Sequence, residues 1–231
     1  LGCNLVKPVY AQISGIDLRR DQHGPYGVLE DDVRTPSRVS YMLQSPNVSQ
    51  TLLSKLYQSQ SVLPVADYPK RLKACLSSTT NKYDPQIVVL TPGRFNSAYY
   101  EHAFLAREMN VPLVHGYDLI VENNHVYIQG VRGKVQVDVI YRRIDDPFLD
   151  PLAFLPDSIL GVSGLMSAYR AGNVVITNAP GTGIADDKSL YPFVPKIIEY
   201  YLGEKPILPN VQTYQCGDAD ELAYVLDHMP E

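Results

Sequence analysis

The sequence has no tryptophan and only three cysteines among its 231 residues. Cys3, Cys75 and Cys216 are widely spaced and form neither a C-x-x-C pair nor a cysteine–histidine set. This spacing argues against a disulfide framework and against a structural zinc site. Because unpaired cysteines are typical of a reducing compartment, we expect a cytoplasmic protein.

Long hydrophobic runs and an excess of basic residues are also missing. No apolar run approaches the roughly 20 residues of a membrane helix, and the first residues lack a signal-peptide pattern. The chain has 20 Lys and Arg against 25 Asp and Glu, a net charge of -5, and its basic residues are scattered. We therefore expect neither a membrane nor nucleic acid as a partner.

The hydrophobic pattern predicts an α/β protein, with hydrophobic residues making up 45% of the chain. Alternation around the break DQHGP predicts a β-hairpin within residues 9–33, followed by a loop over 34–46. Helical spacing over 47–76 predicts two helices. The strands and helices that we expect after them are strand 85–93, a helix from about Asn96, strands within 112–130, strand 137–146, helix 158–172, strand 173–181 and helix 188–203. Their β-α-β order predicts a parallel sheet with a right-handed crossover.

Three carboxylates of the hairpin are candidate metal ligands. If the turn is centred between His23 and Gly24, Asp17 lies opposite Glu30, and Asp32 shares the face of Glu30. Converging carboxylates repel one another unless a cation offsets the charge, and Mg²⁺ prefers such oxygen ligands. The alternative is a solvated hairpin face, and a one-residue slip would move Asp17 away.

A polar loop follows the hairpin and has the donors that a polyphosphate site needs. Arg34, Thr35, Ser37 and Arg38 supply guanidinium and hydroxyl groups. An ordinary turn is the alternative, since Ser, Thr and Pro are common in turns.

Two further clusters lie where strands are expected to end. Arg94, Asn96 and Ser97 lie between a strand and a helix, a position where open α/β sheets bind ligands. Arg142 and Arg143 end the strand within 137–146, and we expect one of them to point into the cleft of the sheet. An Arg–Asp salt bridge is the alternative for this pair. The lone His102 in the first helical turn is typical of a capping or surface residue.

The loop after strand 173–181 contains Gly181 and Gly183, which allow close backbone approach, and Lys188 follows it. Asp187 stands where a Walker A loop requires glycine, so no P-loop is predicted. The alternative for Lys188 is a surface lysine in the first turn of a helix.

Several long strings resemble circularly permuted type 2 ATP-grasp proteins. They include GIDLRRD, YGVLEDDVRTPSRVSYML, LTPGRFNSAYYEHAFLA, VDVIYRRIDDPFLDPLAF and LMSAYRAGNVVITNAPGTGIADDKSLYPFVPKIIEYYLGEKPILPN. They follow the order of that family and cover nearly the whole chain. The family is similar in fold to glutathionylspermidine synthase, so the resemblance implies a Rossmann-like pre-ATP-grasp sheet flanked by helices, with an acidic β-hairpin.

The resemblance also implies roles for residues, with ATP and Mg as cofactors. Asp17, Glu30 and Asp32 fall on metal-binding positions. The other residues with an expected role are Arg34 and Arg142 in catalysis, Lys188, Ser37, Gly181 and Gly183 at the nucleotide, and Arg94, Asn96, Ser97 and Arg143 at the substrate.

Two departures from the family pattern qualify this expectation. Asp32 stands where relatives often have Asn, which adds negative charge. The chain begins at Leu1 and ends at Glu231, before the family's glycine-rich nucleotide lobe, so we expect a segment that lacks its C-terminal ATP-grasp lobe. The expected divisions are 1–78 with the hairpin, 79–204 with the substrate domain, and 205–231 opening the nucleotide lobe.

The resemblance implies an ATP-dependent carboxylate–amine ligase that forms an amide through an acyl phosphate. Its partners would be a carboxylate and an amine substrate together with the missing lobe, and the isolated segment is expected to be inactive. A binding or scaffold module without catalysis is the alternative. A nucleotide-sugar-binding protein is a weaker one, because fold alone is poor grounds for function.

Overall fold

The computed structural model describes residues 7–20, 24–131 and 133–229, and it divides into two compact units. Unit 1 comprises Leu1–Ile13 and Thr35–Gly181, and unit 2 comprises Ser14–Arg34 and Thr182–Glu231. The boundaries of these units differ from the expected boundaries at residues 78 and 204. The predicted hairpin belongs to the same unit as the last fifty residues, Thr182–Glu231.

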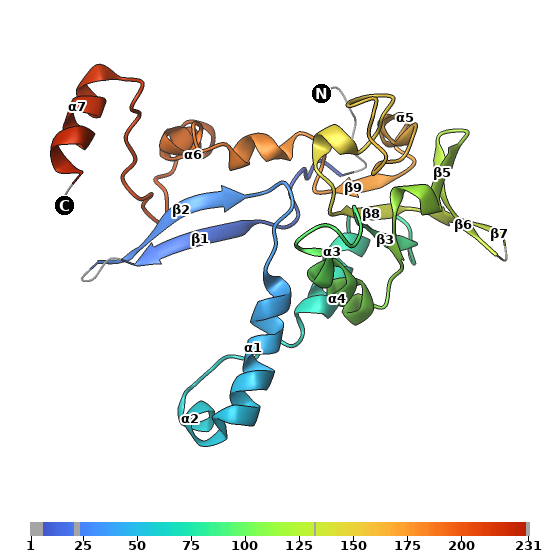
Figure 1. Cartoon of the computed structure of the whole chain (residues 1–231), viewed down its shortest axis with the longest axis horizontal. Helices are drawn as coiled ribbons and strands as arrows, with labels where there is room; N and C mark the ends of the chain where they lie inside the picture. The colour runs from blue at the N-terminus through green and yellow to red at the C-terminus, as the bar shows by residue number, and fades with distance from the viewer. Residues whose placement is uncertain (1–6, 21–23, 132, 230–231) are drawn as a thin grey trace. The chain divides into compact units, whose positions relative to one another are not determined.

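Unit 1 is built on a parallel sheet of four short strands (Figure 1). These are β3 (Ile87–Leu90), β4 (Leu113–Val114), β8 (Val139–Arg142) and β9 (Val175–Thr177), in the order β4-β3-β8-β9. All three neighbouring pairs are parallel, which confirms the prediction of a parallel sheet.

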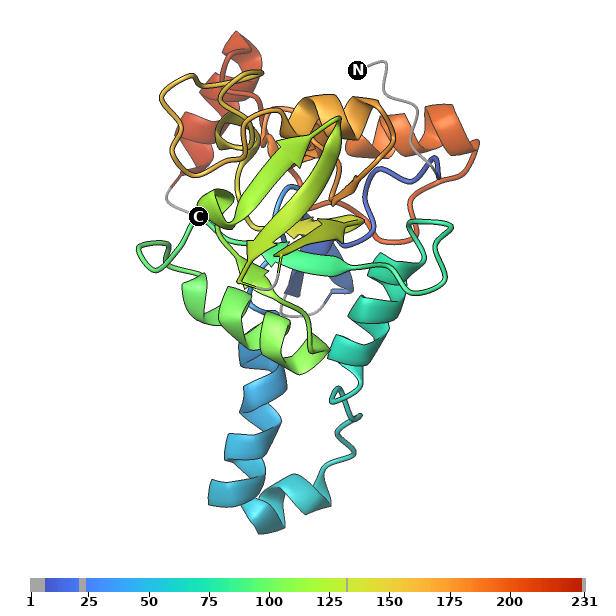
Figure 2. The same cartoon turned by 90° about the vertical axis from the view of Figure 1, so that its right-hand side faces the viewer.

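Side chains of this sheet alternate between two cores, as the two-residue period of a strand requires. Val88 and Leu90 pack in one core, while Ile87 and Val89 pack in the other. Helices α3 (Tyr68–Ser77) and α4 (Tyr99–Met109) contribute to the second core. Helix α5 (Leu165–Arg170) contributes to the first, with the antiparallel sheet of β5 (Leu119–Glu122), β6 (His125–Gly130) and β7 (Gly133–Val137). Figure 2 shows α3 and α4 below the parallel sheet and α5 above it.

The chain leaves the two central strands in opposite directions. From β3 it passes through α4 to β4, and from β8 it passes through α5 to β9. The two helices pack against opposite faces of the sheet. The carboxyl ends of β3 and β8 therefore form a topological switch point, where open α/β sheets leave room for a ligand.

The loop predicted over 34–46 is wrong from residue 39 onward. Helix α1 (Val39–Leu52) includes Pro46, and α2 (Ser54–Ser59) follows it. Proline disfavours a helix interior because it removes a backbone donor. Here tertiary contacts outweigh that local preference, because Leu43 packs in a core and Ser40 is held by Glu101.

One predicted helix is shorter than expected, and one strand of the structure was not predicted. The helix expected over 158–172 covers only α5, because Gly164 precedes it with φ +83° and Gly161 packs against backbone. A Cβ on Gly161 would lie 2.1 Å from the Phe148 carbonyl oxygen. Strand β7 was not expected. Short 3₁₀ turns cover Gly116–Asp118 (η1) and Asp146–Phe148 (η2).

Unit 2 contains the antiparallel pair of β1 (Gly15–Arg20) and β2 (Tyr26–Asp32). Backbone bonds of 2.8 Å join Val28 to Pro209 and Val211, so a third segment lines β2. The remaining elements of unit 2 are η3 (Thr182–Asp186), η4 (Tyr191–Phe193), α6 (Val194–Leu202) and α7 (Ala219–His228). The helix expected over 188–203 begins only at Val194, and it ends at Gly203 with φ +67°.

Within the described ranges, the structure contains no helix long and apolar enough to span a lipid bilayer.

Candidate functional site

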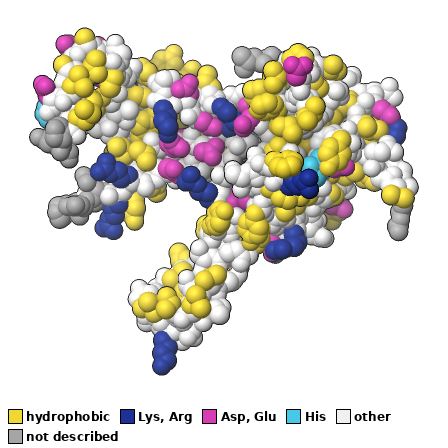
Figure 3. All heavy atoms as spheres, in the orientation of Figure 1, with side chains coloured by type: hydrophobic (Ala, Val, Ile, Leu, Met, Phe, Trp, Pro, Cys, Tyr) yellow, Lys and Arg dark blue, Asp and Glu magenta, His cyan; other side chains and the backbone are white. Residues whose placement is uncertain are grey.

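The first candidate site lies on the β1–β2 pair of unit 2. The register places Asp17 opposite Glu30 and Gly15 opposite Asp32, with an irregularity between Asp17 and Leu18. Figure 3 shows acidic side chains gathered over this strand pair, with basic side chains beside them. No group of three His, Cys, Asp or Glu side chains in the described part of the chain is placed to hold a metal. Metal binding by all three carboxylates stays a prediction.

Lys188 is a cation that contacts this strand pair. Its Nζ forms an ion pair with Glu30 Oε2, although its side chain is 81% exposed. The hydrogen bond and the charge of Glu30, together with the charge of Asp17, raise the pKa of Lys188. Lys188 lies in a turn, and the predicted helical position is wrong because η3 ends at Asp186. The structure thus brings together a predicted nucleotide residue and two predicted metal ligands.

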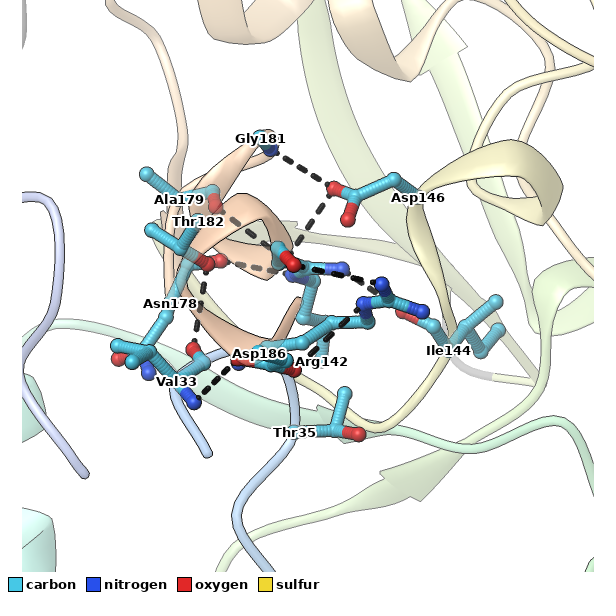
Figure 4. A network of polar contacts seen from close by, with 12 residues as sticks. Val33, Thr35, Arg142, Ile144, Asp146, Asn178, Ala179, Gly181, Thr182 and Asp186 are labelled. Carbon is cyan, nitrogen blue, oxygen red and sulfur yellow. Dashed lines mark hydrogen bonds and ion pairs between the residues drawn. The ribbon is translucent and has the colours of Figure 1, made fainter. Parts of the chain in front are cut away.

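The end of β2 is tied to the loop that contains Gly183. Asp186 Oδ1 accepts the Val33 N–H at 2.7 Å and the Arg34 N–H at 3.2 Å, and Thr182 Oγ1 donates to the Val33 carbonyl at 3.2 Å (Figure 4). Arg34 Nη2 donates to the Gly183 carbonyl at 3.5 Å. A Cβ at Gly183 would lie 2.3 Å from Arg34 Nε, so a side chain there would require the Arg34 guanidinium to move. The predicted residues Arg34 and Gly183 are therefore neighbours.

Arg142, expected as a catalytic residue, is fully buried in unit 1. Its guanidinium donates to the carbonyl groups of Asn178 at 2.7 Å, Ile144 at 3.0 Å and Ala179 at 3.2 Å (Figure 4). Asp146 lies 3.2 Å from Arg142 Nη2 and also accepts the Gly181 N–H at 3.0 Å. The side chain of Arg142 is 0% exposed. The Arg142 guanidinium has no access to solvent, and its hydrogen bonds hold the loop after β9 in place. Its position therefore does not suit contact with a substrate.

Arg143 is also buried, and unlike Arg142 it lines a cavity, described below, where β3 and β8 end. Its Nη1 donates to the Pro36 carbonyl at 2.6 Å and to the Tyr141 hydroxyl at 3.0 Å. Its Nη2 lies 3.5 Å from a carboxylate oxygen of Glu101. The other Glu101 oxygen accepts both the N–H and the hydroxyl of Ser40 at 3.0 Å. Both arginines form salt bridges, as the alternative proposed, although Arg143 pairs with Glu101 rather than with a neighbouring aspartate.

His102 is neither a capping nor a surface residue, because it is 2% exposed. Its Nδ1 lies 2.8 Å from Thr91 Oγ1, which also accepts the Gly93 N–H at 3.2 Å. Because Thr91 is fully buried and its hydroxyl proton has no other acceptor among the described residues, we assign this proton to the bond with Nδ1, which leaves the imidazole proton on Nε2. Burial, aided by the charge of Arg143, lowers the pKa of His102 to about 3. The imidazole is therefore neutral at physiological pH.

A cavity of about 220 Å³ lies at the switch point between β3 and β8. Its polar lining residues are Thr35, Ser37, Asn96, His102, Arg143 and Asp145. Ser37, predicted at the nucleotide, and Asn96 and Arg143, predicted at the substrate, thus surround one space. Pro92 and Ile144, which follow the two strands, are among its apolar lining residues.

The other two residues predicted for the substrate are exposed. Arg94 places its guanidinium 5.0 Å from the centre of the Phe95 ring, and Ser97 lies at the surface. Helix α4 begins at Tyr99, later than expected, and Asn96 Oδ1 accepts the Ala98 N–H at 2.8 Å. Neither Arg94 nor Ser97 is among the residues that line the cavity.

Sequence patterns missed two buried carboxylates that organise unit 1. Glu101 joins Ser40 and Arg143, which are 61 and 42 positions away in sequence. Asp150 accepts the backbone N–H groups of Leu152 at 2.9 Å, Gly164 at 3.0 Å and Met166 at 2.9 Å. No short motif marks either residue, because most of their partners are distant in sequence.

Comparison with known proteins gives a consistent result. A family model described as a circularly permuted ATPgrasp matches residues 1–231. An uncharacterized protein of Mycobacterium tuberculosis is 51% identical over 225 residues, which cover 96% of this chain and 41% of that protein. An uncharacterized protein of Synechocystis is 47% identical over 234 residues, covering 99% of this chain and 49% of that protein.

A third relative is the Frankia alni protein named "Putative glutamate--cysteine ligase 2-3", 39% identical over 221 residues. The alignment covers 94% of this chain but only 26% of that protein. The chain thus spans less than half the length of each of these three relatives. With a match along its whole length and an α/β sheet flanked by helices, the chain belongs to the circularly permuted ATP-grasp family.

Proposed function

We propose that this chain is part of an ATP- and Mg-dependent ligase that joins a carboxylate to an amine. The observation that carries the proposal is the meeting of Lys188 with Glu30, opposite Asp17, in a member of the ATP-grasp family. Paired carboxylates can bind a metal ion, and a lysine beside them can bind the phosphate groups that the metal also contacts. The ligase name of the Frankia alni relative supports the same class of reaction.

The residues of the strand pair fit Mg²⁺ by their chemistry. Mg²⁺ in nucleotide sites takes one or two carboxylates and fills its other positions with water and phosphate oxygens. Asp17 and Glu30 are neighbours across the strands, and Asp32 adds a third carboxylate on β2. In this proposal they hold the metal, while Lys188 contacts the nucleotide phosphates after releasing Glu30.

Arg34 and Gly183 form a second group of residues that we assign to phosphate binding. The carboxylate of Asp186 fixes the backbone at Arg34, and the guanidinium lies beside the Gly183 carbonyl. A fixed guanidinium neutralises charge without needing to reorganise. When bound, ATP would supply the phosphoryl group that turns the acid into an acyl phosphate with loss of ADP, and the amine would then displace phosphate to form the amide.

Isothermal titration of MgATP tests this proposal. It should be run on the 231-residue chain and on the longer mycobacterial relative, each as wild type and as an Asp17→Asn/Glu30→Gln double variant or its aligned equivalent. Asp187→Asn is the matched control, because this exposed carboxylate precedes Lys188 but lies outside the strand pair. We expect at least about tenfold weaker binding in the double variant and no change in the control. MgATP binding that is absent, or unaffected by the double variant, in both proteins would instead favour a binding or scaffold module.

A further inference from the structure

Strand β2 of unit 2 contains one extra residue beside the candidate metal site. Leu18 pairs with Val28, whereas one position earlier on β1 Asp17 pairs with Glu30. Leu29 is therefore left over between Val28 and Glu30, as in a β-bulge. If the register of Leu18 continued, Asp17 would lie opposite Leu29 instead of Glu30. The bulge at Leu29 thus decides whether the two carboxylates lie opposite each other.

Val28, the last residue before this bulge, is held by a segment outside the strand pair. Its N–H donates to the Pro209 carbonyl at 2.8 Å, and its carbonyl accepts the Val211 N–H at 2.8 Å. The two segments also pack closely, because an added Cβ on Gly27 would lie 3.3 Å from a methyl carbon of Val211. The position of the bulge therefore depends on contacts with residues near the other end of the chain.

Tyr191 binds both sides of this junction. Its hydroxyl donates to the Val28 carbonyl, and its oxygen accepts the Val211 N–H at 3.0 Å, so that this N–H is shared between two acceptors. The backbone carbonyl of Tyr191 accepts the side-chain N–H of Asn210 at 3.4 Å. Burial raises the pKa of the Tyr191 hydroxyl, which therefore keeps the proton that it donates to Val28.

Tyr191 also belongs to the segment that carries Lys188. A backbone hydrogen bond of 2.9 Å from the Leu190 N–H to the Asp187 carbonyl closes a turn around Lys188, and Tyr191 follows this turn directly. Lys188 in turn forms its ion pair with Glu30. One side chain thus links the residue before the bulge to the turn that presents the lysine.

We propose that Tyr191 is a positioning residue of the candidate metal–phosphate site, which sets Glu30 opposite Asp17 and beside Lys188. The inference rests on the function proposed above and adds the residue that determines the geometry of that site. Tyr191 acts through Val28 and the bulge, and it contacts neither the metal nor a phosphate in this account. Groups that orient metal ligands in this way affect metal affinity although they do not bind the ion.

Carbodiimide cross-linking measures this geometry without nucleotide or metal. The reagent joins a carboxylate to an amine that is in contact with it, so the yield of the Lys188–Glu30 cross-link, determined by mass spectrometry, reports their proximity. The exposed Lys134–Glu122 ion pair of unit 1 is the internal reference. In Tyr191→Phe, which removes only the hydroxyl, we expect at least about threefold lower yield at Lys188–Glu30 and no change at the reference. An unchanged yield at Lys188–Glu30 would overturn the proposal.

Binding of Mn²⁺, a paramagnetic substitute for Mg²⁺, tests the consequence for the metal. Water proton relaxation measures the Mn²⁺ affinity of the wild-type chain, of Tyr191→Phe and of the control Tyr141→Phe, which removes a buried hydroxyl from unit 1. Circular dichroism shows that each variant is folded. We expect about tenfold weaker binding in Tyr191→Phe and unchanged binding in Tyr141→Phe. Equal affinities of the wild type and Tyr191→Phe would overturn the proposal.

A second variant keeps the test decisive if Tyr191→Phe does not fold. Gly27→Ala crowds Val211 at the same junction and leaves Tyr191 intact, so it should also lower the yield of the Lys188–Glu30 cross-link, and an unchanged yield would count against the proposal. Failure of the wild type to bind Mn²⁺ would refute the proposed metal site, whereas an unchanged cross-link would refute the role of Tyr191. The two failures are therefore distinct.

Discussion

Lys188 forms an ion pair with Glu30 across 158 positions of sequence, and the Lys188 side chain remains 81% exposed. Both residues belong to unit 2, and Asp17 lies opposite Glu30 on the neighbouring strand. A cation from a distant segment thus meets two carboxylates of one strand pair. Such an exposed pair contributes little to stability, since water screens it.

Lys188→Met should therefore leave the urea midpoint of unfolding unchanged while it lowers the affinity for MgATP. The physical reason is that the ion pair is solvated, whereas a bound phosphate would need the ammonium group. Parallel urea unfolding and calorimetry measure the two effects. Lys196→Met on α6 is the control and should change neither, and a large loss of stability in Lys188→Met would contradict the proposed role.

Arg142→Met should lower the free energy of unfolding by about 3–5 kcal/mol. The variant leaves three backbone carbonyl groups and Asp146 without their buried donor. Arg142→Lys should recover only part of the loss, because one ammonium cannot reproduce the fork of a guanidinium. Urea unfolding measures both, with Arg71→Met as an exposed control. An unchanged urea midpoint in Arg142→Met would contradict this structural role.

Glu101→Ala should also cost about 3–5 kcal/mol, because it leaves Arg143 as a buried charge and takes the acceptor from Ser40. Glu101→Gln keeps an acceptor, so its loss should be smaller, about 1–3 kcal/mol. Thermal and urea unfolding test this order. Glu108→Gln on the exposed side of the same helix should be neutral, and equal losses at positions 101 and 108 would refute the account.

His102 should make the protein less stable as the pH falls below about 6.5. Its pKa is about 3 in the folded state and ordinarily 6.5, so between these values the unfolded chain binds a proton that the folded chain does not. The free energy of unfolding should therefore fall by about 1 kcal/mol per pH unit through this window from this residue alone. Urea unfolding at pH 7, 6 and 5 measures the slope. His102→Gln does not titrate and should show a shallower slope, while an unchanged slope would contradict the low pKa.

The sequence by itself was enough for the fold class and the strand pair. Short apolar runs separated by a helical pattern predict a parallel sheet, because β3 and β8 are buried on both faces and their hydrophobicity is continuous. The predicted pairing of Asp17 with Glu30 is confirmed, but counting from the turn does not explain it: Leu18 pairs with Val28, one position away from the predicted register, and an irregularity between Asp17 and Leu18 restores the pairing. These predictions depend on contacts close in sequence.

Only the tertiary structure decided which polar residues are buried and which of them meet. Arg142 and Arg143 are adjacent in sequence and look equivalent, yet one binds backbone carbonyl groups and the other Glu101. His102 looked like a surface residue because no local pattern reports that Thr91 and Arg143 enclose it. Their partners come from other strands and loops, so burial and long-range contacts, which no local periodicity encodes, determined the cavity.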